Sequence, residues 1–255
     1  MSTLLRCLGA QLIYFFETTG EILTLFAQTL GYCKDAFRSR RNIFKQMAFI
    51  GVGTLPIALL MGFFIGMVLA LQTGYQLQRF SLERIIGAVV GLSLAKELGP
   101  VLTGYLVAGR IGAAITAEIG TMRVSEEIDA LHVMGVDPVF YLSMPRFLAS
   151  ILMVPIIVIY VNAIGMIGGA IVSATYVGIG TQKYFDNLFY ELTFGDLLRG
   201  LVKSMFFGGI VATIGCYKGF KTTGGAEGVG RYTTQSVVLS FVLVVVFDYF
   251  LTRLL

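Results

Sequence analysis

Charged residues are scarce in this sequence: Asp, Glu, Lys and Arg together make up 13% of its 255 residues. Soluble domains carry about 25% charged residues. A soluble fold of this length would need an unusually large buried core, which surface-to-volume scaling disfavours. Hydrophobic residues make up 56% of the chain, and the mean hydropathy is +0.82. The shortage of charge therefore places most of the chain in lipid.

Cysteine and histidine are also rare, and this limits the chemistry available to the chain. Cys7, Cys33 and Cys216 are far apart and form no ligand spacing, so they predict neither a disulfide nor a metal site. His132 is the only histidine, so no set of nucleophile, base and orienting group can be built around it. We expect no catalytic residue, no metal and no other cofactor in this chain.

The N-terminal segment lacks the features of a cleaved targeting sequence. It has one basic residue, Arg6, and no small-residue cleavage site before an apolar core. Between Leu4 and Leu30, apolar residues are interleaved with glutamine and glutamate, which favours an amphipathic helix lying in the membrane interface. We therefore expect residues 1–45 to form an interfacial helix followed by a basic segment. The basic residues are Lys34, Arg38, Arg40, Arg41 and Lys45.

Five long apolar stretches follow, and each is long enough to cross a bilayer as a helix, which takes about 20 residues. We predict an all-α integral membrane protein with a single membrane domain over residues 46–255. The predicted spans are about 47–77, 84–110, 147–178, 197–217 and 232–254. Glycines four residues apart would let helix backbones approach closely, although glycine is common in membrane helices generally. These pairs are Gly62 and Gly66, Gly87 and Gly91, Gly165 and Gly169, and Gly215 and Gly219.

The distribution of basic residues sets the orientation of the chain. With the N-terminus inside, the cytoplasmic segments hold twelve of the 19 Lys and Arg residues and the outer segments hold four. Because cytoplasmic loops are enriched in Lys and Arg, this places the polar segment 113–146 in the cytoplasm. The net charge of +4 then reflects topology, and we expect no binding of nucleic acid.

A short amphipathic helix is predicted within this cytoplasmic segment, at about 119–135. Candidate caps precede an apolar face, and a glycine and a proline mark the end of the helix. These residues are Thr121 or Ser125, then Ile128, Leu131 and Met134, then Gly135 and Pro138. Such a helix either docks in a groove of a soluble partner or lies on the lipid headgroups, and the periodicity does not decide between the two.

Several motifs of this sequence resemble the signature of the MlaE permease family. The central ones are LAKELGPVLT at Leu94–Thr103, AGRIGAAITAE at Ala108–Glu118 and IGTMRVSEEIDALHVMGVDP at Ile119–Pro138. Nearer the C-terminus, TTGGAEGVG from Thr222, TTQSVV from Thr233 and DYFLT from Asp248 also match. The resemblance covers about residues 40–255 and implies that 46–255 is one permease domain.

The resemblance implies a dimeric permease of an ABC transporter. Two cytoplasmic ATPase subunits would bind ATP and drive it, and an MCE-domain protein on the far side would exchange lipid with it. The fold implied is an N-terminal interfacial helix, five spans, and a coupling helix between the second and third spans. The cargo implied is phospholipid or a related lipid, and the membrane is a bacterial inner membrane or, alternatively, a plastid inner envelope. The residues carried over to the ATPase contact are Glu118, Arg123, Glu126, Asp129 and Met134.

Charges inside the predicted spans give a second indication of function. Isolated charges in hydrocarbon are costly and usually face a cavity or a partner. Lys96, Arg199 and Lys203 are candidates to bind a lipid phosphate, with Glu97 neutralising Lys96. Alternatively, Lys96 forms an internal ion pair with Glu97 of a neighbour that only holds helices together, and Arg199 extends to the surface. We expect Asp248 to be a structural partner for a polar group.

Two other classes of function stay open from the residues alone. A membrane enzyme acting on lipid would need convergent acid, base or metal ligands at one depth, which these spans almost lack. A purely structural scaffold would explain the helices and glycines, but not Lys96, Glu97 and Lys203. The glycine-rich segment Gly224–Gly230 lacks the Gly-Lys-Ser/Thr of a phosphate-binding loop, so it predicts a tight turn and no ATP site.

Overall fold

The computed structural model describes the backbone of residues 2–255 and the side chains of Ile13 and of residues 16–255. Met1 and the side chains of Arg6, Cys7 and Gln11 lie outside the described residues. The described chain is built from helices, with no strand among residues 2–255. Five helical stretches are long and apolar enough to cross a membrane, which confirms the predicted all-α membrane fold. They are Phe16–Gln78, Glu83–Val124, Val139–Val177, Phe194–Phe220 and Gly225–Leu254.

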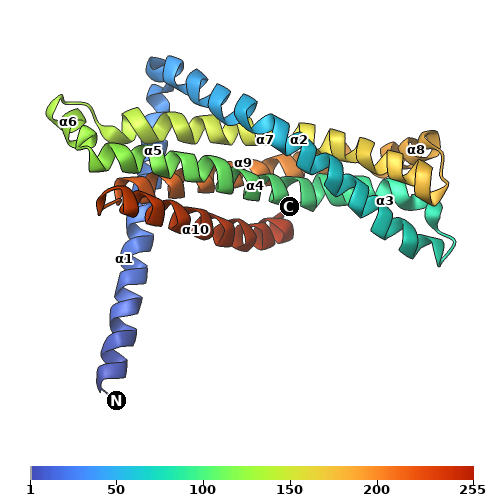
Figure 1. Cartoon of the computed structure of the whole chain (residues 1–255), viewed down its shortest axis with the longest axis horizontal. Helices are drawn as coiled ribbons and strands as arrows, with labels where there is room; N and C mark the ends of the chain where they lie inside the picture. The colour runs from blue at the N-terminus through green and yellow to red at the C-terminus, as the bar shows by residue number, and fades with distance from the viewer. Residues whose placement is uncertain (1) are drawn as a thin grey trace.

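The N-terminal helix is set apart from the bundle of spans. Helix α1 (Ser2–Tyr32) runs across one end of the bundle at a steep angle (Figure 1). The 3-10 segment η1 (Cys33–Ser39) then turns the chain into α2 (Arg40–Gln78). Where α1 crosses the bundle, Glu21 accepts a hydrogen bond of 2.8 Å from the Tyr217 hydroxyl. A helix lying across the ends of the spans has the arrangement predicted for an interfacial helix.

The second span is a continuous helical rod that contains two π-helical turns. It runs on to Val124, beyond the predicted end at Arg110. The hydropathy pattern assigns Glu118 to water, and its side chain is half-exposed, but its carboxylate also pairs at 2.8 Å with the buried guanidinium of Arg146 in the third span. The pieces in order are η2 (Glu83–Ile85), α3 (Ile86–Ser93), the π turn η3 (Leu94–Leu98), α4 (Gly99–Val107), the π turn η4 (Ala108–Gly112) and α5 (Ala113–Val124).

The connection to the third span is shorter than predicted. Helix α6 (Glu127–Val133) is a separate short helix, whereas residues 119–124, placed in the same helix by the sequence, belong to α5. The third span begins at Val139 and not at 147. It consists of η5 (Val139–Ser143), α7 (Met144–Val172) and η6 (Ser173–Val177).

Of the three remaining helices, the first and the last each follow a glycine, and the middle one follows a threonine that caps it. Helix α8 (Thr181–Glu191) lies in the short polar segment predicted between the third and fourth spans. Helix α9 (Phe194–Phe220) starts with a capping box in which the side chains of Thr193 and Asp196 bond to each other's backbone. Helix α10 (Gly225–Leu254) follows Gly224, whose φ of +89° suits glycine. Most of the glycine-rich segment is therefore the start of α10, and only its first residues form the predicted tight turn.

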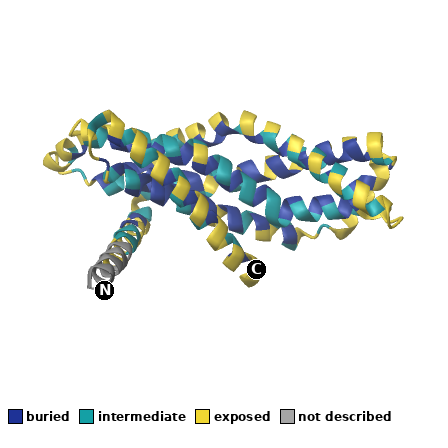
Figure 2. Cartoon of the chain, turned by 60° about the horizontal axis from the view of Figure 1, so that its bottom comes forward, coloured by how far each residue is buried: buried dark blue, intermediate teal, exposed yellow. Residues whose placement is uncertain are grey.

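The four predicted glycine pairs all lie at contacts between helices. A side chain on Gly66 would collide with the backbone of Gly165, so α2 and α7 touch along their main chains. A Cβ on Gly62 would lie 2.8 Å from the carbonyl oxygen of Val161, and one on Gly219 would lie 2.7 Å from the Ile119 Cβ. Figure 2 shows the result: buried residues line the inside of the bundle, and exposed residues face outward.

Candidate functional site

The π turn η3 carries Lys96 and Glu97 and touches two neighbouring helices through glycine. Gly200 of α9 faces the Ala95 carbonyl so closely that a side chain would not fit. Gly99 faces the amide of Asn162 on α7 in the same way. Because α9 packs directly against η3, the side chains of Lys96 and Glu97 can contact residues of α9. π turns occur frequently at functional sites.

Lys203 is the centre of a charged cluster between three spans. Its side chain is 2% exposed, and its ammonium group lies 2.7 Å from Glu97 Oε2 and 3.2 Å from Asp248 Oδ1. It also donates a hydrogen bond of 2.7 Å to the Thr252 hydroxyl. A buried ammonium group is tolerated only with such partners. The prediction that Asp248 is a structural partner for a polar group is confirmed.

Lys96 pairs with a carboxylate that is distant from it in the sequence and was not predicted as its partner. Its ammonium group lies 2.9 Å from Asp196 Oδ1, and a guanidinium nitrogen of Arg199 lies 3.8 Å from the same oxygen. The predicted neutralisation of Lys96 by Glu97 is therefore wrong, because Glu97 is engaged by Lys203. Asp196 was assigned to the connecting segment; its signal was the i,i+3 spacing to Arg199 on one helix.

The three cations among the predicted lipid-site residues differ in exposure. The Lys96 and Arg199 side chains are 40% and 54% exposed, and they share one carboxylate. Lys203 is enclosed and faces two carboxylates, Glu97 and Asp248. Positive charge accessible to a ligand therefore lies with Lys96 and Arg199, while Lys203 is held inside the bundle.

Arg110 is a further cation that lies within a span of the structure. Its guanidinium donates a hydrogen bond of 2.7 Å to the Thr54 hydroxyl of α2 and stacks over the Phe49 ring at 5.8 Å. No carboxylate pairs with it among the residues that the structure describes. In the sequence, Arg110 marks the predicted end of the second span, and nothing there predicts a partner for it.

The segment expected to contact an ATPase forms a braced tip at the end of α5. Arg123 pairs with Asp129 at 2.6 Å and so ties α5 to α6. Between these helices Glu126 has a left-handed backbone with φ +63°. The predicted cap by Thr121 or Ser125 is wrong, because the Ser125 hydroxyl donates to the Thr121 carbonyl at 2.9 Å and α6 starts without a side-chain cap.

The end of α6 matches the predicted glycine stop. Gly135 has φ +74°, and the Val136 N–H donates to the Leu131 carbonyl at 2.9 Å, which completes a Schellman motif. The predicted apolar face is divided, because Ile128 is buried against the protein's own core, whereas Met134 is 67% exposed. Next to Met134, Val133 is 89% exposed. The tip thus presents an apolar pair outward on a short, braced helix.

The comparisons with known proteins agree with this architecture. The Permease MlaE family matches residues 43–254. A probable ABC transporter permease protein of Rickettsia typhi is 45% identical over 213 residues, which is 84% of this chain and 82% of that protein.

Two further relatives come from another bacterium and from a plant. The intermembrane phospholipid transport system permease protein MlaE of Haemophilus influenzae is 37% identical over 254 residues, which is 98% of this chain and 97% of that protein. The chloroplastic protein TRIGALACTOSYLDIACYLGLYCEROL 1 of Arabidopsis thaliana is 40% identical over 212 residues, 83% of this chain and 61% of that protein. The bacterial relatives and the five apolar helices indicate a multi-pass inner-membrane protein, and the Arabidopsis relative is compatible with a plastid membrane. This chain belongs to the MlaE family of ABC transporter permeases.

Proposed function

We propose that this chain is the membrane subunit of an ABC transporter that moves phospholipid between the inner membrane and an MCE-domain partner. One observation carries the proposal: the similarity to the Haemophilus phospholipid transport permease covers 98% of this chain and 97% of that protein. The match therefore includes the N-terminal helix as well as the five spans. The chain supplies the lipid pathway, and a separate ATPase subunit binds and hydrolyses ATP.

The ATPase subunit docks on the tip formed by α5 and α6. Two exposed apolar side chains, Val133 and Met134, suit a groove in a soluble partner, and Glu126 adds an exposed carboxylate at the other end of α6. Arg123 and Asp129 join α6 to α5. The pair between Glu118 and Arg146 joins α5 in turn to the third span. A movement of α6 would therefore be transmitted through these ion pairs to the membrane helices.

The lipid phosphate is held by the two accessible cations, Lys96 and Arg199. They share Asp196, so the trio keeps one positive charge in excess for an anionic group. Lys203 and Glu97 fix the position of η3 and α9 beside this site. Acyl chains lie along the apolar helix faces.

A second copy of the chain completes the pathway through α10. In the most apolar stretch of α10 only 17% of the residues are buried, compared with 56% in α9. An exposed apolar helix face suits either lipid tails or a symmetric contact between two protomers. The family resemblance favours the homodimer.

Co-purification tests the ATPase contact. The wild-type chain should retain its ATPase subunit, and the double variant V133D/M134D should lose it while still inserting in the membrane. The matched control is F189D/Y190D, which places the same two charges on two similarly exposed apolar neighbours of α8, at the opposite end of the molecule (Figure 1). If no ATPase accompanies the wild-type chain, or if V133D/M134D binds it as well as F189D/Y190D does, the docking proposal fails.

Crosslinking with a photoactivatable phospholipid tests the lipid site. The double variant K96Q/R199Q should be labelled severalfold less than the wild-type chain, because the phosphate loses both cations. K183Q is the control, since Lys183 is an exposed cation of α8 that makes no ion pair in the described residues. Equal labelling of K96Q/R199Q and K183Q would instead favour a purely structural role for the cluster.

A further inference from the structure

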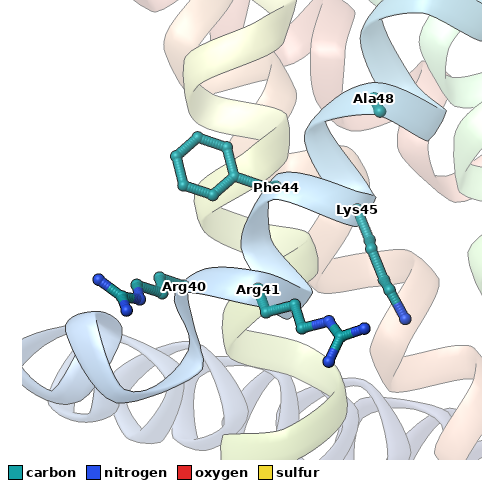
Figure 3. A pocket seen from close by; sticks show the side chains of 5 residues that line it. All are labelled: Arg40, Arg41, Phe44, Lys45 and Ala48. Atoms are coloured by element: carbon teal, nitrogen blue, oxygen red, sulfur yellow. The ribbon is translucent and has the colours of Figure 1, made fainter.

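The first turns of α2 form a basic surface at the elbow between α1 and α2. Arg40, Arg41, Phe44, Lys45 and Ala48 line a shallow, open depression there, which we call the elbow surface. Figure 3 shows Arg41 and Lys45 extending from the same side of the helix, with Arg40 and the Phe44 ring on the other. Positions four residues apart share a helix face, which explains these two rows.

This surface has no counter-charge of its own. None of the ion pairs in the described part of the chain involves Arg40, Arg41 or Lys45, whereas Lys96, Arg146 and Lys203 are all paired. The sequence contains no Asp or Glu between Asp35 and Glu83. The cations of the elbow surface are therefore free to bind an external anion.

The placement of these cations is unfavourable for the helix alone. Helix α2 has no acidic residue in its first turn, and cations at a helix N-terminus oppose the macrodipole. Arg41 and Lys45 are also like charges four residues apart, which destabilises a helix further. A bound anion would offset both effects, so we expect the ligand of this surface to be negatively charged.

Exposed aromatic rings beside the cations identify where the anion comes from. The Phe44 side chain is 67% exposed and that of Phe37 is 81% exposed, and the Arg40 guanidinium lies 5.3 Å from the centroid of the Phe37 ring. An uncharged apolar helix follows directly, from Gln46 to Gln78. Apolar rings adjoining cations at the start of a span match the boundary between lipid headgroups and acyl chains.

We propose that the elbow surface binds the phosphate headgroups of anionic phospholipids in the surrounding leaflet, with the phenylalanine rings among their upper acyl chains. This site is separate from the proposed cargo site at Lys96 and Arg199. It anchors the junction of α1 and α2 to the lipid. The interfacial helix is then held at two places, by its contact with the bundle and by the lipid headgroups at its elbow.

The absence of tryptophan from the chain permits a direct test. In F44W the indole is the only one in the protein, and brominated acyl chains quench it on contact. The variant is reconstituted in phosphatidylcholine vesicles with a minor fraction of phosphatidylglycerol. In one preparation the phosphatidylglycerol is brominated, and in the other an equal amount of phosphatidylcholine is brominated instead. The control is F64W, because Phe64 is similarly exposed on α2 but lies five turns further along the helix.

F44W should be quenched more strongly by the brominated phosphatidylglycerol, and F64W equally by both lipids. Adding R41Q and K45Q to F44W should reduce the preference by about fivefold for each cation removed. Equal quenching of F44W by the two lipids, or a preference that survives both substitutions, overturns the proposal. So does protection of F44W from both lipids when the ATPase subunit is bound, since the surface would then belong to an acidic protein.

Discussion

Glu97 and Lys203 join the second and fourth spans through an ion pair of 2.7 Å, and the lysine of this pair is 2% exposed. Asp248 of α10 approaches the same ammonium group, so a single cation connects three spans. In hydrocarbon no water can replace a lost partner. The cluster therefore fixes the relative positions of α9, α10 and the π turn that also bears Lys96.

Replacing Lys203 by Met should destabilise the protein strongly. The substitution preserves the length of the side chain but leaves Glu97 and Asp248 without their shared cation. Breaking a buried pair by removing one partner costs about 3–5 kcal/mol. Thermal unfolding of the purified protein in detergent would measure the loss.

Neutralising the acidic partners as well separates charge from packing. The triple variant K203M/E97Q/D248N removes the uncompensated carboxylates and should recover much of the lost stability. If K203M is as stable as the wild type, or if the triple variant is no better than K203M, the cluster does not act as an electrostatic clamp.

Gly66 makes a second, independent prediction about the contact between α2 and α7. An added methyl group would meet the backbone of Gly165, which cannot move aside as a flexible side chain could. Gly66→Ala should therefore separate the helices and lower stability by about 1–3 kcal/mol. Gly109→Ala is the control, because its Cβ would meet only the Phe241 ring at 3.9 Å, an ordinary contact. Equal melting temperatures of the two variants would contradict the close-contact explanation.

The sequence was sufficient for the number of spans but not for their ends. Charged residues become frequent after Arg110, so the second span was predicted to stop there although the helix continues to Val124. Glu118 lies in this extension and is neutralised by Arg146, which is distant in sequence. Pairs of this kind become visible only once the helices are placed side by side.

The same limit explains the wrong partner for Lys96. Lys96 and Glu97 are adjacent and opposite in charge, so the sequence suggests that they neutralise each other. The π turn and the close approach of Gly200 instead present them to two different levels of α9, where Asp196 and Lys203 lie seven residues apart. A π turn has no recognisable sequence pattern here, so the pairing could not be predicted.

The two ion pairs made by α5 should differ in strength. The guanidinium of Arg146 is buried beside Glu118, whereas Arg123 and Asp129 are both substantially exposed. Glu118→Gln should cost about 3 kcal/mol because it leaves a buried cation unpaired. Asp129→Asn should cost less than about 1 kcal/mol, as exposed pairs generally do.

Unfolding by a chemical denaturant ranks these two variants, and the salt dependence of stability separates the two ion pairs. Denaturation of E118Q and D129N in the same detergent gives the ranking, and added salt should weaken only the Arg123–Asp129 pair of the wild type. A larger loss in D129N than in E118Q would contradict the burial argument.

Glu126 supplies the last prediction, because its backbone and its side chain can be separated by substitution. With φ +63° and ψ 11° it occupies the left-handed region, which costs residues other than glycine about 1–2 kcal/mol. Its N–H donates to the Arg123 carbonyl at 3.3 Å and its carbonyl accepts from Ala130 at 3.0 Å, and both bonds survive any replacement other than proline.

Glu126→Gly should therefore keep or increase the protection of the α6 amides from hydrogen exchange, whereas Glu126→Val should reduce it, since β-branched residues tolerate this conformation least. Binding of the ATPase subunit to the same two variants then isolates the carboxylate. If the carboxylate is part of the contact, binding falls in both variants; if only the turn matters, binding falls in E126V alone. Equal hydrogen exchange in the two variants would show that the left-handed turn is not what positions α6.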